Sequence, residues 1–324
     1  MMACRVCLKP VGGKPKTEGF HDACLRRLLG TAVLPPLEQI TRQSLLKQGR
    51  ERMRSGKRFS ISGVQIKFTA KVNKGELLLG EQGGDLILKP DAKPDEFPGL
   101  PANEHVSMLI AKHMGLEVPA CGLLPLADGS LLYVIRRFDR NKDGTAVHQE
   151  DLMQALSIAN TTDAKYEACS YERAGNAVRT ACGRGQAAVE FMKRLVAMFA
   201  IGNGDYHLKN ISLIRPMDKP VSLTPLYDVV NTQVYDDVHR LAMDVMEEDE
   251  LEAFSIHGFE TRADFLQLAR ALGVSEKAVS NFIDRKVLNQ LPDIQQLISN
   301  SYLDRSLKPQ YLEIIEQHFR CLAM

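Results

Sequence analysis

The feature that most constrains this chain is the string Asn-Gly-Asp-Tyr-His-Leu-Lys-Asn at residues 203–210. It sets Asp205 and Asn210 in an Asp-x4-Asn arrangement, and a further carboxylate follows at Asp228. Phosphoryl transfer from MgATP needs one carboxylate to orient and deprotonate the acceptor hydroxyl. It also needs an amide oxygen and a second carboxylate to hold Mg²⁺ against the phosphates. An Asp and an Asn in a loop are usually only turn residues, so the string becomes informative through the segments upstream.

Three upstream segments come in the order of a protein kinase. Residues 85–90 predict a short buried strand ending near Lys89, a cation suited to the phosphates of ATP. A helix is predicted over residues 103–114, with apolar side chains along one face. Glu104 lies in its first turn, where it either aims Lys89 or is only a terminal charge that complements the helix dipole. Residues 131–138 predict a strand leading into the hinge between kinase lobes.

With these segments in place, the chain resembles the HipA-like serine/threonine kinases of bacterial toxin–antitoxin systems. The resemblance spans roughly residues 58–230 in the family's order and is most specific at residues 203–210. It is greatest to the shorter HipT branch, which lacks the amino-terminal subdomain of HipA and has a separate small protein in its place. The matching stretches are residues 60–67, 87–90, 103–105, 137–140, 148–151, 203–210 and 223–228.

The resemblance implies a role for each matching position. Asp205 would be the catalytic base, with His207 beside it in the catalytic loop, and Asn210 and Asp228 would hold Mg²⁺. Residues 62–67 would form the phosphate loop, and the backbone at the hinge would contact adenine. The implied nucleotide-binding residues are Ser62, Gly63, Val64, Gln65, Lys67, Lys89, Glu104, Arg136, Phe138, Lys209 and Tyr227.

The phosphate loop departs from the family's pattern. It has one glycine, Gly63, whereas ordinary protein kinases carry three. Relatives commonly have Ala-Gly-Ala-Gln where this chain has Ser-Gly-Val-Gln at residues 62–65, and a Glu or Pro at the position of Ile66. Because backbone N–H groups cradle the phosphates, one glycine can suffice.

Two serines near this loop are predicted autophosphorylation sites. The resemblance places Ser60 where relatives carry a regulatory phosphoserine, and Ser62 is an additional hydroxyl. Each phosphate would add about −1.5 to −2 charge at neutral pH and would repel the nucleotide. Basic side chains at residues 47–58 could then hold the loop outward; alternatively, that run is simply solvated. Modification is expected to switch the kinase off, and the alternative is two unmodified turn serines.

The amino terminus carries a separate signal. Cys4-x2-Cys7 and His21-x2-Cys24 form a Cys3His set within residues 1–30. Tetrahedral zinc takes ligands of this kind, and some members of the family begin in a similar way. So short a segment buries little apolar surface unaided, so a metal would give it a fold. We expect a structural zinc; the alternative is four unligated residues in a frayed terminus.

Composition agrees with a cytoplasmic enzyme. The 324 residues suit a bilobal kinase, and 44% hydrophobic with 25% charged residues is ordinary for a soluble protein. A net charge of +1 argues against nucleic-acid binding by the whole surface. No apolar run approaches the ~20 residues of a membrane span, and a signal-peptide core is missing. Seven cysteines, an odd number, favour the reducing cytosol over a disulfide framework.

We therefore expect an α+β, protein-kinase-like bilobal fold. A zinc module at residues 1–30 would precede a small β-rich N-lobe at 31–137, which includes a hairpin at 68–80. A mainly helical C-lobe would follow at 138–324. Residues 161–186 are polar and contain glycines, so a mobile substrate-facing segment is expected there, with Tyr166 in incidental packing. Helices are predicted over residues 189–199, 262–272, 276–290 and 309–322.

The predicted activity is transfer of the γ-phosphoryl group of MgATP to a serine or threonine of a protein. The resemblance implies a toxin that phosphorylates a translation component such as an aminoacyl-tRNA synthetase. It also implies small antitoxin partners, one of which could be a helix-turn-helix DNA-binding protein. For this chain itself we expect no direct sequence-specific nucleic-acid binding and no membrane binding. A small-molecule phosphotransferase, or a catalytically weak nucleotide-binding corepressor, is the alternative. Intact Lys89, Asp205 and Asn210 argue against a degraded site.

Overall fold

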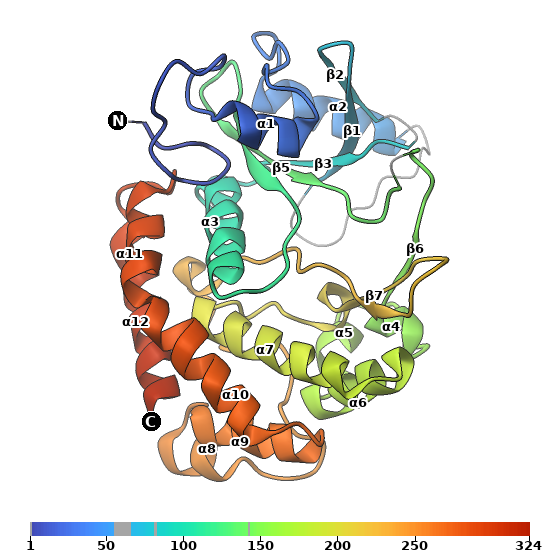
Figure 1. Ribbon diagram of the computed structural model, residues 1–324, viewed down its shortest axis with the longest axis vertical. Coiled ribbons are helices and arrows are strands. Elements are labelled where there is room, and N and C mark those ends of the chain that lie inside the picture. The colour runs from blue at the N-terminus through green and yellow to red at the C-terminus, as the bar shows by residue number, and fades with distance from the viewer. Residues whose placement is uncertain (1, 55–65, 81–82, 142) are drawn as a thin grey trace. The chain divides into compact units, whose positions relative to one another are not determined.

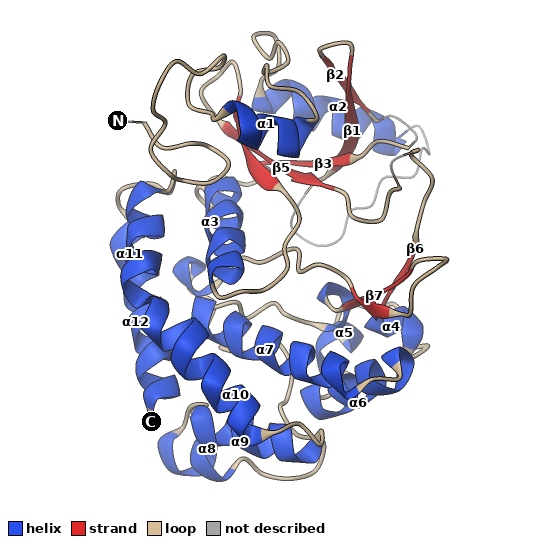
Figure 2. Ribbon diagram, in the orientation of Figure 1, coloured by secondary structure: helices blue, strands red, loops and turns tan. Residues whose placement is uncertain are grey.

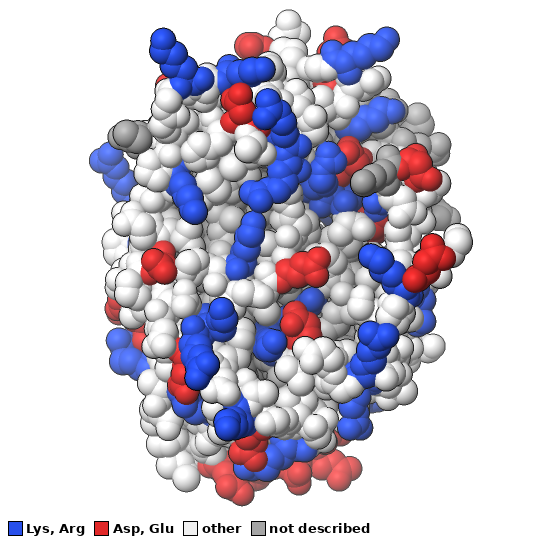
Figure 3. Space-filling view, viewed as in Figure 1, with Lys and Arg blue, Asp and Glu red and all other residues white. Residues whose placement is uncertain are grey.

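The computed structural model describes residues 2–54, 66–80, 83–141 and 143–324 (Figures 1 and 2). They divide into two compact units. Unit 1 comprises Met1–Leu109, Pro119–Ala146 and Leu297–Arg305, and unit 2 comprises Ile110–Val118, Val147–Gln296 and Ser306–Met324. Within the described residues, every helix is too short or too polar to cross a membrane. Basic and acidic side chains are both spread over the face in Figure 3, in keeping with the net charge of +1.

Unit 1 is built on a five-stranded antiparallel sheet with the strand order β2-β1-β3-β5-β4. Its strands are β1 (Phe68–Asn73), β2 (Glu76–Leu79), β3 (Leu86–Pro90), β4 (Cys121–Pro125) and β5 (Leu131–Arg136). The predicted hairpin is confirmed: Asn73 pairs with Glu76 across a two-residue turn. Both turn residues, Lys74 and Gly75, have positive φ, at 48° and 85°, which suits the right-handed twist of a hairpin.

Three helices accompany this sheet: α1 (Asp22–Leu29), α2 (Arg42–Arg54) and α3 (Leu100–His113). Helix α1 ends at Gly30, whose φ of 78° allows its N–H to reach the carbonyl of Arg26. The buried face of α1 joins side chains of the first strands in one apolar core, among them Leu25, Leu28 and Leu88. The amino-terminal segment therefore buries its apolar side chains against the sheet.

Unit 2 is mainly helical and holds a small antiparallel sheet with the order β6-β7-β8. The strands are β6 (His148–Asp151), β7 (Ser212–Arg215) and β8 (Ser222–Leu223). Helix α7 is buried along its length and packs on α6, α10 and α12. The helices are α4 (Leu152–Ala155), α5 (Ala164–Glu167), α6 (Tyr171–Cys182), α7 (Gly185–Ile201), α8 (Glu252–His257), α9 (Arg262–Ala271), α10 (Glu276–Phe282), α11 (Leu291–Asn300) and α12 (Leu307–Ala323).

The segment at residues 161–186 differs from its prediction, because most of it is helical. Ser170 caps α6 by accepting a hydrogen bond from the backbone N–H of Arg173. Gly175 lies in the middle of α6, where a Cβ would come within 2.6 Å of Leu272. This glycine therefore reflects close helix packing, whereas the sequence had suggested a loop.

Candidate active site

A buried ion pair joins β3 to α3 within unit 1. Lys89 Nζ lies 2.6 Å from Glu104 Oε1, and the two residues are 6% and 0% exposed. The antiparallel register sets Lys89 opposite Tyr133 on β5, and the ammonium lies 5.7 Å from the centroid of that ring. Removing two charges from water is costly unless their geometry is good. The predicted partnership is confirmed, and Glu104 is not a surface charge at a helix end.

The segment after β5 is fixed by charges. Asp139 receives two hydrogen bonds from Arg137, at 2.8 and 2.5 Å, and one from Arg140 at 3.0 Å. Burial alone would raise the pKa of Asp139, but these arginines lower it below its usual range. The backbone N–H of Arg136 donates to the carbonyl of Ala120. This N–H is therefore hydrogen-bonded within unit 1, and a backbone contact from Arg136 to adenine stays a prediction.

The phosphate-loop residues and the predicted phosphoserines fall outside the part of the chain that the structure describes. Lys67, the last residue of that stretch, is described and partly buried. The residues outside are Ser60, Ser62, Gly63, Val64 and Gln65.

The Asp-x4-Asn loop of unit 2 is held by its own neighbours. Asn203 Oδ1 accepts a hydrogen bond from the backbone N–H of Asp205 at 2.9 Å. Asn210 Nδ2 donates to the carbonyl of Asp205 at 2.8 Å, which closes the loop across its base. A Cβ on Gly204 would lie 2.3 Å from the carbonyl oxygen of His239. Asn203 and Asn210 thus stabilise the loop through hydrogen bonds, and Gly204 allows the close approach of the His239 backbone.

The carboxylate of Asp205 is 46% exposed and is covered on one side by α5. The Tyr166 hydroxyl donates to Asp205 Oδ1 at 2.7 Å. Lys165 Nζ donates to His207 Nε2 at 2.9 Å, and this nitrogen lies 3.6 Å from Asp205 Oδ1. Burial, followed by the charge of Lys165, lowers the pKa of His207 despite the opposing effect of Asp205. The lowered pKa favours the neutral imidazole, whose Nε2 can accept the hydrogen bond from the Lys165 ammonium.

Lys165 and Tyr166 were missed by the sequence analysis, and the expectation that Tyr166 packs incidentally was wrong. Its ring meets the imidazole of His207 edge-on, with centroids 5.1 Å apart. The ammonium of Lys165 lies 4.4 Å from the same tyrosine ring. The sequence offered no signal for these contacts, because they depend on how α5 packs against the loop.

Asn210 and Asp228 carry oxygen donors, and their role as magnesium ligands stays a prediction. Asn210 donates through Nδ2, which leaves its Oδ1 as an acceptor, and Asp228 supplies carboxylate oxygens, the donors that Mg²⁺ prefers. Asp228 has a φ of 59°, a left-handed conformation that is strained for a residue with a Cβ and is common at functional sites. The surrounding structure therefore holds the backbone of Asp228 in a conformation that residues with a Cβ seldom adopt.

Two other predicted nucleotide contacts lie elsewhere. The Tyr227 hydroxyl bonds Ser212 Oγ at 2.6 Å and the carbonyl of Lys209 at 3.0 Å. Burial raises the pKa of Tyr227. This side chain therefore links β7 to the loop, and its role as a nucleotide contact stays a prediction. Lys209 Nζ donates to the side-chain oxygen of Asn160, and its role as a nucleotide contact stays a prediction.

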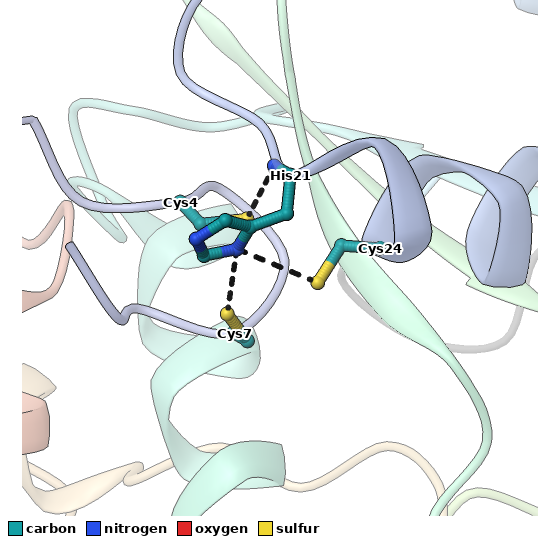
Figure 4. Close-up of side chains that lie close together, drawn as sticks. All are labelled: Cys4, Cys7, His21 and Cys24. Carbon is teal, nitrogen blue, oxygen red and sulfur yellow. Dashed lines mark hydrogen bonds between the residues drawn. The ribbon is translucent and has the colours of Figure 1, made fainter. Parts of the chain in front are cut away.

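The four amino-terminal ligand candidates converge in unit 1, as Figure 4 shows. Their ligand atoms all lie within 4.8 Å of one another. His21 Nδ1 is 3.4 Å from the sulfur of Cys7 and 3.8 Å from that of Cys24. Tetrahedral zinc with Zn–S bonds of about 2.3 Å sets such ligand atoms about 3.5–3.8 Å apart. His21 Nε2 is 3.1 Å from the Pro10 carbonyl, which orients the ring as an outer partner would.

Solved structures with kinase-like folds share this architecture. HipA of the Shewanella oneidensis toxin–antitoxin system, solved with HipB and its operator DNA, superposes with a TM-score of 0.67 at 22% identity, over 90% of this chain and 74% of that one. The Helicobacter pylori proinflammatory kinase CtkA gives a TM-score of 0.54 at 13% identity, over 81% of this chain and 89% of that one. The predicted α+β, kinase-like bilobal fold is confirmed.

Residues 59–293 match the family model of the HipA-like C-terminal domain, and the chain belongs to that family. A Haemophilus influenzae relative named "Putative kinase" is 27% identical over 94% of this chain and 92% of its own length. The Sinorhizobium fredii relative "Putative kinase Y4dM" is 38% identical over 55% of this chain and 46% of its own length. A second one, "Putative kinase Y4mE", is 30% identical over 71% and 55%. The chain thus spans about half of each S. fredii protein.

Proposed function

We propose that this protein is an ATP-dependent serine/threonine protein kinase. The observation that carries the proposal is the hydrogen bond of 2.7 Å from the Tyr166 hydroxyl to Asp205 Oδ1. The Tyr166 hydroxyl bonds Asp205 in the way that the hydroxyl of an acceptor serine or threonine must bond a catalytic base. The loop around Asp205 is closed by Asn210, so the base and a magnesium ligand are fixed with respect to each other.

In this mechanism Asp205 orients the acceptor hydroxyl and takes its proton as the oxygen attacks the γ-phosphorus, while the bond from that phosphorus to the β–γ bridging oxygen breaks and ADP leaves. Lys89, aimed by Glu104, neutralises charge on the phosphates. Asn210 and Asp228 would hold Mg²⁺, which supplies charge neutralisation when it is bound. Because burial lowers the pKa of His207, its imidazole adds little positive charge to that of Lys165 near the base.

The nucleotide contacts of residues 62–67 and of the Arg136 and Phe138 backbones form part of the same proposal. So do the module boundaries at residues 1–30, 31–137 and 138–324. At Arg136, the carbonyl is the group left to contact adenine, since the N–H bonds Ala120. Autophosphorylation at Ser60, Ser62 or both would switch the kinase off through repulsion of the nucleotide.

The family and the Shewanella structure support a wider biological role. That relative is HipA in complex with HipB and DNA. For this chain we propose a cytoplasmic toxin that phosphorylates a translation component such as an aminoacyl-tRNA synthetase. Small antitoxin partners, one a helix-turn-helix protein, would neutralise it.

The amino-terminal Cys3His set supports a structural zinc. Its four ligand atoms are already within 4.8 Å of one another, and protein ligands fill all four tetrahedral positions. Purified protein is expected to contain one zinc per chain, and Cys4→Ser is expected to contain little. Less than about a tenth of an equivalent in unchelated wild type would contradict a site of this affinity class.

The kinase proposal is tested by incubating the protein with γ-labelled ATP in a bacterial lysate. Wild type should transfer label to serine or threonine of a protein, which mass spectrometry then identifies. Asp205→Asn should not do so, and Asp218→Asn, an exposed turn carboxylate of the same unit, should match wild type. Label that reaches only small molecules would identify a small-molecule phosphotransferase instead.

A further inference from the structure

The metal-site candidate is joined to the sheet and to α3 by the two residues between its first cysteines. Arg5 accepts a hydrogen bond from the backbone N–H of Leu123, on β4, at 2.9 Å. The carbonyl of Val6 lies 3.2 Å from His105 Nε2 on α3. The turn that presents Cys4 and Cys7 is thus attached to both elements.

The turn that carries Cys4 and Cys7 packs so closely on β4 that Gly122 has no room for a side chain. A Cβ on Gly122 would come within 3.0 Å of the carbonyl oxygen of Arg5, of Leu28 and of Val6. The far end of the turn is also tied down, since Asn300 Nδ2 donates to the carbonyl of Leu8 at 3.1 Å. Movement of the turn therefore transmits directly to its neighbours, because packed interiors yield little.

His105 is the link to the ion pair, because it directly follows Glu104 in α3. Its side chain is fully buried. Among the described residues, Nδ1 has no hydrogen-bond partner, so the bond to Val6 is the one polar contact found for this ring. With the proton on Nε2, the neutral imidazole donates to the Val6 carbonyl and fixes this turn of α3 against the Cys4–Cys7 turn.

We propose that metal bound by Cys4, Cys7, His21 and Cys24 positions α3 through Val6 and His105, and thereby sets how Lys89 meets the nucleotide. The inference rests on the kinase function and on the zinc site proposed above. In protein kinases the Lys–Glu pair must be in place for activity, and the helix that carries the Glu is the element that control mechanisms move. Here the control element would be a metal-bound turn, and His105 is a positioning residue.

Variants that cut this link at different points provide the test. His105→Ala removes the donor and leaves the four ligands intact, and His105→Gln restores an N–H donor of similar reach. Cys7→Ser removes a ligand. His113→Ala is the control for loss of a histidine from the same helix, because His113 bonds Asp293 and its side chain is 34% exposed. For each full-length protein, zinc content, melting temperature and affinity for a fluorescent ATP analogue are measured. Binding is measured below the melting temperature of every variant, and competition with unlabelled ATP confirms that the analogue occupies the nucleotide site.

The expected result is that Cys7→Ser lacks zinc and binds nucleotide about tenfold more weakly, the scale of one buried hydrogen bond left unmade. His105→Ala should show the same loss of affinity while it retains one zinc per chain. His105→Gln should recover most of the affinity, and His113→Ala should equal wild type. This pattern separates positioning from general destabilisation, because affinity is measured below all melting temperatures and His105→Gln restores the N–H donor at the same buried position.

Unchanged nucleotide affinity in His105→Ala, with wild type binding ATP normally, would overturn the inference and leave the kinase proposal intact. An equal loss in His113→Ala would also overturn it. If wild type fails to bind ATP at all, the proposed function fails and the inference fails with it. Should Cys7→Ser not fold, the two His105 variants still decide, because they keep every metal ligand.

Discussion

Lys89 and Asp205, the proposed phosphate cation and catalytic base, lie in two regions that are built differently. Lys89 is 6% exposed, and a direct contact of 2.6 Å with Glu104, fifteen positions later in the chain, balances its charge. Asp205 is 46% exposed on its side chain, and residues within five positions of it fix its backbone. The first arrangement depends on the packing of a helix on a sheet, whereas the second is set almost wholly by its own string. Changes in distant packing should therefore affect Lys89 before they affect Asp205.

The largest effect is expected from Asp205→Asn. A positioned general base contributes about 10²–10⁴ in rate, so phosphoryl transfer should fall by that factor. ATP affinity should stay within about twofold, since the exposed loop keeps its backbone bonds and only one proton acceptor is lost. Kinetics and nucleotide titration check both quantities, with Asp228→Asn as the contrast that should weaken Mg²⁺-dependent binding. Activity near that of wild type in Asp205→Asn would remove this residue from the chemistry.

Glu104→Gln tests the buried side of the comparison. It removes the carboxylate charge that the buried Lys89 ammonium contacts at 2.6 Å, which should lower the free energy of unfolding by about 3–5 kcal/mol. The control is Glu96→Gln, because Glu96 pairs with Lys93 at a similar 2.7 Å but both side chains are about half exposed. That exposed pair should be worth less than about 1 kcal/mol. Similar losses in the two variants, measured by chemical denaturation, would contradict the contrast.

His318 is a buried ionisable side chain without a charge, and it can be compared with Lys89, which is buried with its charge. Burial, with the nearby charge of Arg240, lowers the pKa of His318 to about 4. Because the unfolded chain takes up this proton near pH 6.5, the folded state should lose about 2 kcal/mol between pH 7 and pH 5. His318→Phe, which can still stack on Phe199, should remove that share of the pH dependence. Denaturation at the two pH values measures it, and an unchanged slope would refute the assignment.

The smallest effect is expected from Tyr166→Phe. Its hydroxyl occupies Asp205 Oδ1, which an acceptor hydroxyl must reach. Removing a net hydrogen bond of about 1 kcal/mol should raise phosphoryl transfer ~5-fold. In an Asp205→Asn background the same change should have no effect, which a double-mutant cycle would reveal. Reduced activity in Tyr166→Phe would make this tyrosine a positioning group and not a competitor.

The comparison also explains what could be predicted from the sequence. Asn203 and Asn210 have local roles, because each makes a short hydrogen bond within the string. Gly204 is required by a residue distant in sequence, since its Cβ would meet the carbonyl of His239. The strands that carry Lys89 and its pairing with Glu104 followed from order and periodicity.

Features that depend on packing between elements were not visible in advance. The sequence does not reveal that α5 lays Tyr166 on Asp205, or that the Tyr227 hydroxyl is used inside the unit. Gly175 suggested a loop, although it marks the place where Leu272 approaches α6 most closely. In each case, a residue distant in sequence decides the role, and local propensity carries no record of it.

The tie between the two ends of the chain has a consequence for synthesis on the ribosome. Tyr302 donates to the carbonyl of Ala3 at 2.5 Å, and Leu297–Arg305 belongs to the same compact unit as the first strands. Domains usually fold in the order in which they emerge, but this one lacks a piece of itself until residue 305 has been translated. The nascent chain therefore carries its Cys3His turn and its Lys89 strand in an incomplete unit until residue 305 has been added. A message cut short before that point would yield no complete unit 1.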